Sequence, residues 1–230
     1  MVNTFITGPS PRSVKNLDKR RLNAQRKEAY QILTTLKAKR KAEKRGETVK
    51  IGYDNHPATL MWKGYEEALK VYINNCIKYF IRRGGSTVME RLKVDKDKVI
   101  WPWWFTWESL HLSHKCSLLR KDPHYYSKIF KLTREEKVWM KYGYIWPTDL
   151  SERQVARIKR GKVYPPEDVC RVIGTGAPAQ YRWSIKEVKQ WKKNKTVNPK
   201  TGRTISSTAK TGVYKDIKKA YDYYDRNDEL

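Results

Sequence analysis

The sequence predicts a mainly α-helical protein, and three observations lead to that fold class. Apolar residues recur at helical spacing over long stretches, Gly and Pro fall at the ends of those stretches, and no strong period-two strand pattern occurs. The chain has 230 residues, 39% of them apolar, which is enough to bury a core. We expect a compact helical domain over residues 1–150, a linker with a short helix over 151–180, and a small basic α module over 181–230.

The first expected helix covers about residues 12–45. Leu22, Ala29, Leu33 and Leu36 recur at helical spacing, and neither Gly nor Pro interrupts the stretch before Gly46. The charged residues 37–45 are expected to extend into solvent. The run from 39 to 45 fits either a nuclear import signal or the solvated basic end of a helix.

The second expected helix begins at Pro57 and ends before Gly84-Gly85, because Pro suits a first helical position and Gly follows a last turn. Cys76 falls on its apolar stripe and is expected to be a core thiol. Further expected elements are helices at 108–119, 123–130 and 151–162, aromatic segments at 99–107 and 142–147, connectors at 165–166 and 174–178, a helix around Trp191, a turn at 198–203 and a helix from Val213.

The charge of the chain predicts a polyanionic partner. There are 50 Lys and Arg against 24 Asp and Glu, a formal charge of +26, and residues 151–230 alone hold 19 basic and 9 acidic residues. Because both halves are basic, one charged tail does not explain the excess, and nucleic acid is the usual partner of such a chain.

Other features exclude membrane and secretory classes of protein. No stretch approaches the roughly 18 consecutive apolar residues of a membrane span, and residues 1–11 lack the pattern of a secretory signal. Cys76, Cys116 and Cys170 are odd in number and far apart, which favours free thiols in a reducing compartment. We expect an intracellular protein.

Glu28 is the candidate catalytic residue that the spacing itself indicates. Arg21, Gln25 and Glu28 share one face of the first helix, and positions 24 and 32 carry no cation to hold Glu28 ionised. A carboxylate at the margin of a core has a raised pKa, which suits an acid that also acts as a base. The alternative is an ordinary helix Glu paired with Lys27 or with a distant Arg.

Aromatic and histidine residues admit two interpretations each. The Trp residues at 101, 103, 104 and 107 supply either a wedge between base pairs or, more simply, core packing. His111, His114 and Cys116, with His124 further on, do not have the spacing of a recognised zinc site, so neither a metal nor a cofactor is expected. The His residues are interpreted as contacts to phosphate or to an abasic sugar, or as interior groups.

Four ordered blocks of sequence resemble a known family. Residues 17–33 read Leu-Asp-x-x-Arg-Leu-x-x-Gln-Arg-x-Glu-Ala-x-Gln-Ile-Leu, and 56–72 read His-Pro-Ala-Thr-x-Met-Trp-x-Gly-Tyr-Glu-x-Ala-Leu-x-x-Tyr. Residues 111–125 read His-x-Ser-His-x-x-Ser-Leu-Leu-Arg-Lys-Asp-Pro-x-Tyr, followed by Tyr-x-Trp-Pro at 144–147. Over about residues 3–147 the chain resembles the pyrimidine-dimer DNA glycosylases of the phage endonuclease V type and their bacterial and large-virus relatives.

The resemblance implies a compact helical body and a glycosylase with abasic-site lyase activity on double-stranded DNA. In the family the α-amine of the mature N-terminus attacks the sugar C1′, a helical Glu assists, and elimination cuts the strand. Carried onto this sequence, the nucleophile is Val2, exposed by removal of Met1, and the Glu is Glu28. The residues expected to contact DNA are Arg21, Gln25, Arg26, Lys27, His56, Arg82, Arg83, His114, Arg120 and Lys121.

Two departures from the family pattern bear on activity. Residue 2 is Val where the phage enzyme has Thr. Val2 carries a free α-amine only if Met1 is removed. Lys27 stands beside Glu28 where the phage enzyme has Arg, which replaces a bidentate donor with a point charge. The alternative function is therefore a catalytically inactive, virus-encoded DNA-binding or virion protein that keeps the fold for non-specific duplex binding.

The C-terminal module resembles a two-cysteine adaptor domain of large DNA viruses. The pattern is Trp191-x-x-Asn194-x-x-Val197-Asn198-Pro199-x-Thr201-Gly202-Arg203-x-Ile205, followed by Tyr214 and Ile217. The two cysteines that name the domain are absent, with Val188 and Ala220 apparently in their places. The resemblance implies a viral origin, with the protein in the host nucleus or cytoplasm or packaged in a virion. It also implies a docking role, with a viral protein as candidate partner. RNA binding has no supporting motif. Oligomeric state is left open.

Overall fold

The computed structural model describes residues 3–48, 51–162, 164–169, 179–206 and 212–226. Within these ranges the fold is mainly α, as predicted, with no β-strand and one isolated bridge between Val197 and Thr204. The buried apolar side chains form two hydrophobic clusters, one drawn from residues 5–169 and the other from residues 179–224.

The long first helix, α1 (Lys19–Lys44), begins later than the sequence pattern predicts. A 3-10 helix, η1 (Pro11–Asn16), precedes it and ends at Leu17 in extended backbone. Asp18 then starts α1 as its N-cap, because its carboxylate accepts a hydrogen bond from the Arg21 backbone N–H at 2.9 Å. The same carboxylate accepts a hydrogen bond from the Tyr126 hydroxyl at 2.6 Å, which ties the start of α1 to α5 (Pro123–Tyr126).

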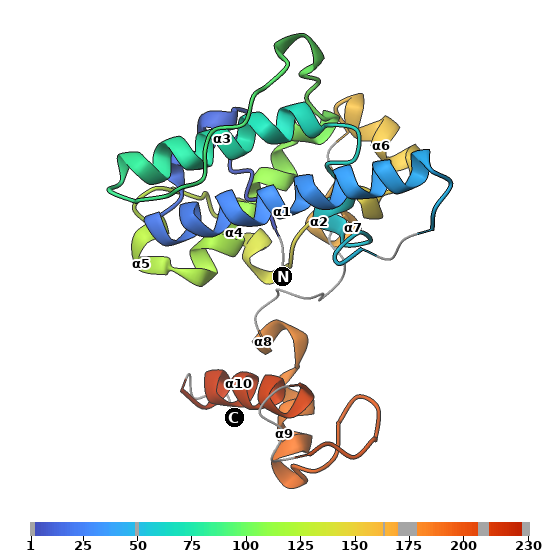
Figure 1. Ribbon diagram of the computed structural model, residues 1–230. Coiled ribbons are helices and arrows are strands. Elements are labelled where there is room, and N and C mark those ends of the chain that lie inside the picture. The colour runs from blue at the N-terminus through green and yellow to red at the C-terminus, as the bar shows by residue number, and fades with distance from the viewer. Residues whose placement is uncertain (1–2, 49–50, 163, 170–178, 207–211, 227–230) are drawn as a thin grey trace.

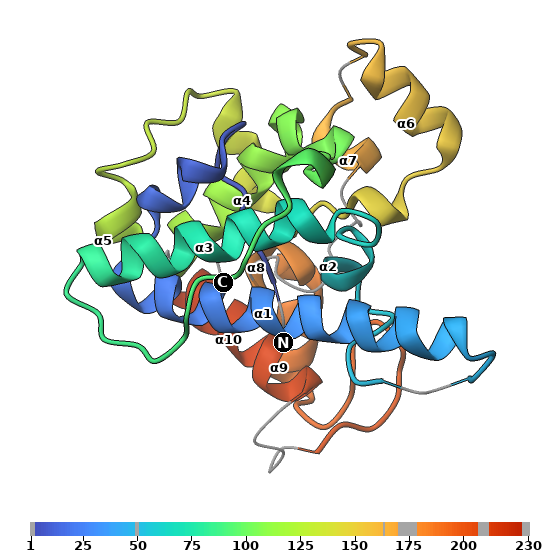
Figure 2. The same cartoon turned by 45° about the horizontal axis from the view of Figure 1, so that its top comes forward.

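The single helix predicted from Pro57 to Gly84 is wrong, because the chain breaks it into α2 (Pro57–Leu60) and α3 (Glu66–Arg82). Gly64 between them has a φ of +87°, a left-handed conformation that only Gly adopts at little cost. The break turns the chain so that α3 lies beside α1, and both views show the two helices side by side (Figures 1 and 2).

The remaining elements of the large body cover one side of this pair. α4 (Glu108–Lys121) and α5 follow the expected helices closely, although α5 ends earlier than the predicted residue 130. The aromatic stretch after residue 99 and the 142–147 segment contribute partly buried rings to the large cluster. Short elements complete the body: η2 (Lys96–Lys98), η3 (Trp103–Thr106), η4 (Glu136–Lys141), η5 (Pro147–Asp149), α6 (Glu152–Lys159) and α7 (Pro166–Val169).

The C-terminal residues build a second core of their own. Figure 1 shows α8 (Ala179–Arg182), α9 (Ile185–Lys193) and α10 (Val213–Arg226) packed together. Val188 and Ala220, the positions associated with the missing cysteines, are both fully buried in this second cluster. Apolar side chains therefore fill the core at these two positions.

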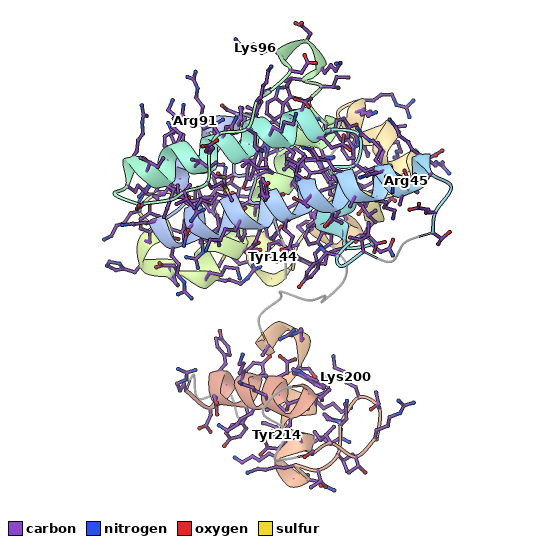
Figure 3. The ribbon with its side chains drawn as sticks, in the orientation of Figure 1. Arg45, Arg91, Lys96, Tyr144, Lys200 and Tyr214 are labelled. Atoms are coloured by element: carbon purple, nitrogen blue, oxygen red, sulfur yellow. The ribbon has the colours of Figure 1, made fainter. Side chains whose placement is uncertain are left out.

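Basic side chains are spread over the surface of the large body. Figure 3 shows Arg45 at the far end of α1, Arg91 beside α3 and Lys96 at the tip of the loop after α3. Part of the basic end of α1 is paired, since Lys39 lies 3.7 Å from Asp54 and Arg40 lies 2.5 Å from Glu66. Among the described helices, none combines the length and the apolar character that crossing a membrane requires.

The connector predicted at 174–178 and the thiol of Cys170 lie outside the described residues. Cys76 and Cys116 are both free and buried. Cys76 is completely buried on α3, as the core interpretation of its stripe predicted, and burial raises the pKa of its thiol. The reactive thiolate form is therefore suppressed in Cys76 at neutral pH.

Candidate functional site

The first described residues form an extended segment that runs through the interior of the large body. Residues 3–7 read Asn-Thr-Phe-Ile-Thr, and none of them is more than 7% exposed. The first residues of most domains are exposed and poorly held. We refer to residues 3–7 as the N-terminal segment, and its burial requires partners for every backbone N–H and carbonyl group.

Helix α1 supplies the first partners. The Asn3 N–H donates to Glu28 Oε2 at 2.8 Å, and the Phe5 N–H donates to Gln25 Oε1 at 2.8 Å. Gln25 Nε2 in turn donates to the Asn3 carbonyl at 3.1 Å. Because Gln25 and Glu28 share one face of α1, they hold the start of the segment against that face.

Helices α3 and α4 hold the rest of the segment. The Tyr72 hydroxyl lies 2.7 Å from Gln25 Oε1 and accepts a hydrogen bond from the Phe5 N–H at 3.1 Å. His114 Nδ1 accepts from the Ile6 N–H at 2.9 Å, and Trp62 Nε1 donates to Thr4 Oγ1 at 2.9 Å. Three helices, α1, α3 and α4, and the turn that carries Trp62 thus fix the position of the N-terminal segment.

Glu28 is partly buried at the point where the segment begins. Desolvation raises the pKa of its carboxyl group, while the Asn3 N–H and the nearby Lys121 act in the opposite direction. Neither Lys27 nor a distant Arg forms an ion pair with it within the described residues, so the alternative of an ordinary paired Glu is not what the structure shows. A raised pKa makes the carboxyl group of Glu28 a better proton acceptor than an ordinary Glu.

A cleft of about 420 Å³ opens in front of Glu28. Its walls include Arg20 and Arg21 from α1, Lys121 from the last turn of α4, and Tyr144. Desolvation and the neighbouring Arg21 and Arg120 lower the pKa of Lys121. The cleft therefore presents one carboxyl group and a rim of cations, an arrangement that favours an anionic ligand.

Some expected DNA contacts lie at this cleft, and others do not. Arg21 and Lys121 line it, although Arg21 is also paired with Asp18 at 2.6 Å. Gln25 lines it too, but the residue is 1% exposed and its amide is used by the N-terminal segment, so its role as a DNA contact needs correction. Lys27 is exposed and lines a separate groove with residues 86–93.

Arg26 also needs correction as a phosphate contact. Its side chain is almost buried, with the guanidinium 4.8 Å from the Phe80 ring centroid and 2.6 Å from Asn23 Oδ1. These contacts hold the guanidinium in the interior and leave little of it at the surface, although its buried Nε has no hydrogen-bond partner among the described residues.

The remaining expected contacts are distributed over the body. His56 caps α2 by accepting from the Ala58 N–H at 3.1 Å, and Arg120 donates to the Met140 carbonyl at 2.9 Å. Arg82 and Arg83 are exposed at the end of α3, where Arg83 donates to the Lys15 carbonyl at 2.8 Å. None of these four residues lines the Glu28 cleft.

His114 is an interior group and does not reach DNA in this fold. It is completely buried, and desolvation lowers its pKa to about 3, so its ring is neutral and its Nδ1 accepts from the segment. His111 is buried as well and its Nε2 lies 2.9 Å from the Phe105 carbonyl. In the described part of the chain no three His, Cys, Asp or Glu residues are grouped as a metal site would need.

The Trp residues of the 101–107 stretch divide between core and surface. Trp104 is buried against Trp62, with ring centroids 4.9 Å apart. Trp101, Trp103 and Trp107 are partly exposed, and none of them lines the Glu28 cleft.

Five residues of the cleft were not among the predicted site residues: Asn3, Phe5, Arg20, Ala24 and Tyr144. Arg20 has no ion pair or hydrogen bond within the described residues. Its position directly before Arg21 was the one sequence feature that could have indicated it. The sequence indicated only a packing role for Tyr144 in an aromatic segment. Figure 3 shows it below α1, and burial raises the pKa of its hydroxyl. Asn3 carried no signal, because its role depends on the path of the backbone.

Comparison with known proteins agrees with the resemblance seen in the sequence. Residues 2–92 match the pyrimidine dimer DNA glycosylase family, and residues 189–219 match the 2-cysteine adaptor domain. The first match includes Glu28 and the α2–α3 region, but it ends before the blocks at 111–125 and 144–147. The second match begins directly after Val188 and ends directly before Ala220, so it includes neither residue. No curated protein and no solved structure matches the chain. The N-terminal part of this chain, with its cleft at Glu28, is thus related in sequence to the pyrimidine dimer DNA glycosylases, and its C-terminal part to the 2-cysteine adaptor domains.

Proposed function

We propose that the protein is a DNA glycosylase with abasic-site lyase activity, and that its reaction takes place in the Glu28 cleft. The observation that carries the proposal is the 2.8 Å hydrogen bond between the Asn3 N–H and Glu28 Oε2. It brings the start of the chain, a half-buried carboxyl group and a cationic rim to one place. The family relationship of residues 2–92 supports the same chemistry.

The proposed nucleophile is the α-amine of Val2, which lies outside the described residues. Only a few covalent bonds separate that nitrogen from the Asn3 amide that Glu28 binds. The proposal requires that Met1 is removed, so that residue 2 carries the free amine. An α-amine has a pKa near 8, well below that of a Lys side chain, so a useful fraction is unprotonated at neutral pH.

The proposed reaction begins when this amine attacks C1′ of a damaged nucleotide. A nitrogen–carbon bond forms, the glycosidic bond breaks, and the base leaves with the bonding electrons and a proton. Loss of the remaining proton on that nitrogen, with cleavage of the C1′–O4′ bond and protonation of O4′, gives an imine between residue 2 and the opened sugar. Removal of a C2′ proton then expels the 3′ phosphate and cuts the strand, and water hydrolyses the imine to release the enzyme.

Glu28 is the group positioned to move these protons. Its raised pKa allows it to donate to the departing base or sugar oxygen and to accept the C2′ proton afterwards. Arg20, Arg21 and Lys121 line the same cleft and are suited to hold the phosphates on either side of the reacting sugar.

Borohydride trapping tests the proposal directly. The protein, confirmed by mass spectrometry to begin at Val2, is incubated with duplex DNA that carries one abasic site or one cyclobutane pyrimidine dimer, and borohydride is added. We expect a covalent adduct that peptide mapping places at residue 2. In Glu28→Gln the single-turnover rate of adduct formation should fall by roughly 100-fold or more, within the range of general acid–base catalysis.

The alternative function, an inactive DNA-binding or virion protein, gives a different result in the same assay. Wild-type protein would bind any duplex in a salt-sensitive way and form no adduct with either substrate. That outcome, obtained with a chain shown to begin at Val2, would refute the excision reaction while leaving DNA binding intact.

A further inference from the structure

A second pocket, of about 650 Å³, lies between the start of α4 and the segment that follows α6. It shares no lining residue with the Glu28 cleft. Its walls come mainly from residues beyond 92, outside the match to the glycosylase family. The pocket is therefore a separate feature of this chain.

Aromatic rings form much of the pocket wall. Trp103 and Trp107 are partly exposed there, with ring centroids 5.5 Å apart and planes tilted by 39°, and Trp139 and Tyr164 also line it. Exposed ring faces in a concave site suit a flat ligand that stacks, and any nucleobase offers such a face. A volume of this size accommodates one nucleotide.

Cations stand beside the rings. Lys159 and Lys162 are exposed and line the pocket, and neither has an ion pair within the described residues. The first turn of α4 lines it as well, and the N-cap of that helix, Trp107, provides no side-chain hydrogen bond. Free N–H groups at a helix start, together with two ammonium groups, favour an anion such as a phosphate.

Two polar groups of the pocket have unused hydrogen-bonding capacity. The Tyr164 hydroxyl is buried from solvent and has no hydrogen-bond partner in the described part of the chain. The exposed Glu108 carboxylate forms no ion pair there. A carboxylate accepts hydrogen bonds from an exocyclic amino group, as in contacts between Glu and cytosine, and it repels the carbonyl edge of thymine.

We propose that this pocket binds one unpaired nucleotide of a DNA strand, with its base against Trp103 and Trp107 and its phosphate at Lys159 and Lys162. Glu108 selects a base that carries an amino group. The pocket would let the protein hold single-stranded DNA next to the duplex that its basic surface attracts. This pocket is separate from the Glu28 cleft, so nucleotide binding there does not depend on the reaction at Glu28.

The test compares matched variants of the full chain in binding to short single-stranded oligo(dC) and oligo(dT) at fixed salt. Trp107→Leu is paired with Trp101→Leu, because Trp101 does not line the pocket, and Lys159→Gln is paired with Lys41→Gln, an exposed residue on α1. We expect Trp107→Leu and Lys159→Gln to weaken oligo(dC) binding by about tenfold, and the controls by less than about threefold. Oligo(dC) should also quench tryptophan fluorescence in the wild type and less so in Trp107→Leu.

Further variants separate the remaining outcomes. Glu108→Gln should reduce the preference for oligo(dC) over oligo(dT), and Glu28→Gln should leave it unchanged, which distinguishes this site from the excision cleft. If Trp107→Leu does not fold, the exposed Lys159 and Glu108 variants decide the result. Equal weakening by each variant and its control, or displacement of the oligonucleotide by a proline-rich peptide that binds the same rings, would overturn the proposal.

Discussion

At the residue scale, Glu28 is held in two opposing ways. Burial at the edge of the core disfavours its charged form, and the Asn3 N–H favours it. The net effect is a raised pKa, so ionised Glu28 costs the folded state free energy. Catalytic carboxyl groups often carry such a cost, because the environment that tunes them for proton transfer also strains the fold.

The first prediction concerns this cost. Glu28→Gln should raise the free energy of unfolding at pH 7, provided that Gln keeps the hydrogen bond from Asn3. The pKa of Glu28 is higher in the folded state than in the unfolded state, where it is about 4.3. Protonated Glu28 therefore contributes its full stability below the unfolded pKa, and this contribution is lost as pH rises through the folded-state pKa. The difference between variant and wild type should therefore vanish near pH 4. Urea unfolding at both pH values measures it; a variant that is less stable at pH 7 would contradict the proposed desolvation.

His114 supplies a second prediction with the opposite sign. Its folded pKa is lowered to about 3, so below about pH 6.5 the unfolded chain binds a proton that the folded chain does not. Stability should fall as pH drops from about 6.5 toward 3, by at most about 1.4 kcal/mol per pH unit from this group. In His114→Asn, where an amide oxygen can replace Nδ1 as acceptor, that part of the slope should disappear.

The exposed His124 provides the control. His124→Asn should leave the pH dependence of unfolding close to that of the wild type. If both variants show the same slope as the wild type, His114 is not buried as a neutral ring.

At the element scale, the N-terminal segment behaves as part of the core although it belongs to no helix. Its backbone groups are satisfied mainly by side chains, above all by Gln25, which accepts from Phe5 and donates to Asn3. Buried backbone groups that lose such partners carry a cost of about 1–3 kcal/mol each. The segment is therefore sensitive to single substitutions on α1.

We expect Gln25→Ala to lower the free energy of unfolding by about 2–4 kcal/mol, because the buried Asn3 carbonyl loses the Gln25 amide as donor and the Phe5 N–H keeps only its longer bond to the Tyr72 hydroxyl. Hydrogen exchange at the amides of residues 3–6 should accelerate more than exchange in α3. Gln31→Ala makes the same change at an exposed position of α1 and should shift stability by less than about 0.5 kcal/mol. Unchanged exchange at Phe5 would show that Gln25 does not hold the segment.

The elements also show what the sequence could and could not predict. Residues 17–33 predicted a helix that presents Gln25 and Glu28 on one face, and the structure has them there, because helical spacing is a local property. The break at Gly64 was missed, since an isolated Gly in an apolar stripe is compatible with a continuous helix. Burial of the N-terminal segment was beyond prediction, because it depends on side chains as far along the chain as His114, which binds Ile6.

At the scale of the whole molecule, the charge of +26 and its even distribution predict salt-dependent DNA binding. The logarithm of the binding constant for duplex should fall linearly with the logarithm of salt concentration. If Arg20 contacts one phosphate, Arg20→Ala should reduce the magnitude of that slope by about 0.9. Arg12→Ala is the control, because it removes an exposed Arg outside the cleft, and it should change the slope less. An unaltered slope in Arg20→Ala would place the bound duplex elsewhere.

The two hydrophobic clusters predict two separable unfolding events, which also tests the expected boundaries near residues 150 and 181. Ile217 and Ile73 are both fully buried, one in each cluster. Ile217→Ala should destabilise the module by about 2–5 kcal/mol and accelerate exchange in α8, α9 and α10 but not in the large body. Ile73→Ala should do the same in the large body but not in the module. Loss of protection across both clusters from either change would show that they unfold as one unit.

The route of the N-terminal segment sets a constraint on biosynthesis. A ribosome delivers residues 3–7 first, but Tyr72 and His114, which hold them, emerge much later. Contacts so distant in sequence form late in folding. The N-terminal segment therefore stays undocked until α4 has been translated, and a bulky group attached ahead of Asn3 would have to be accommodated at the Glu28 cleft.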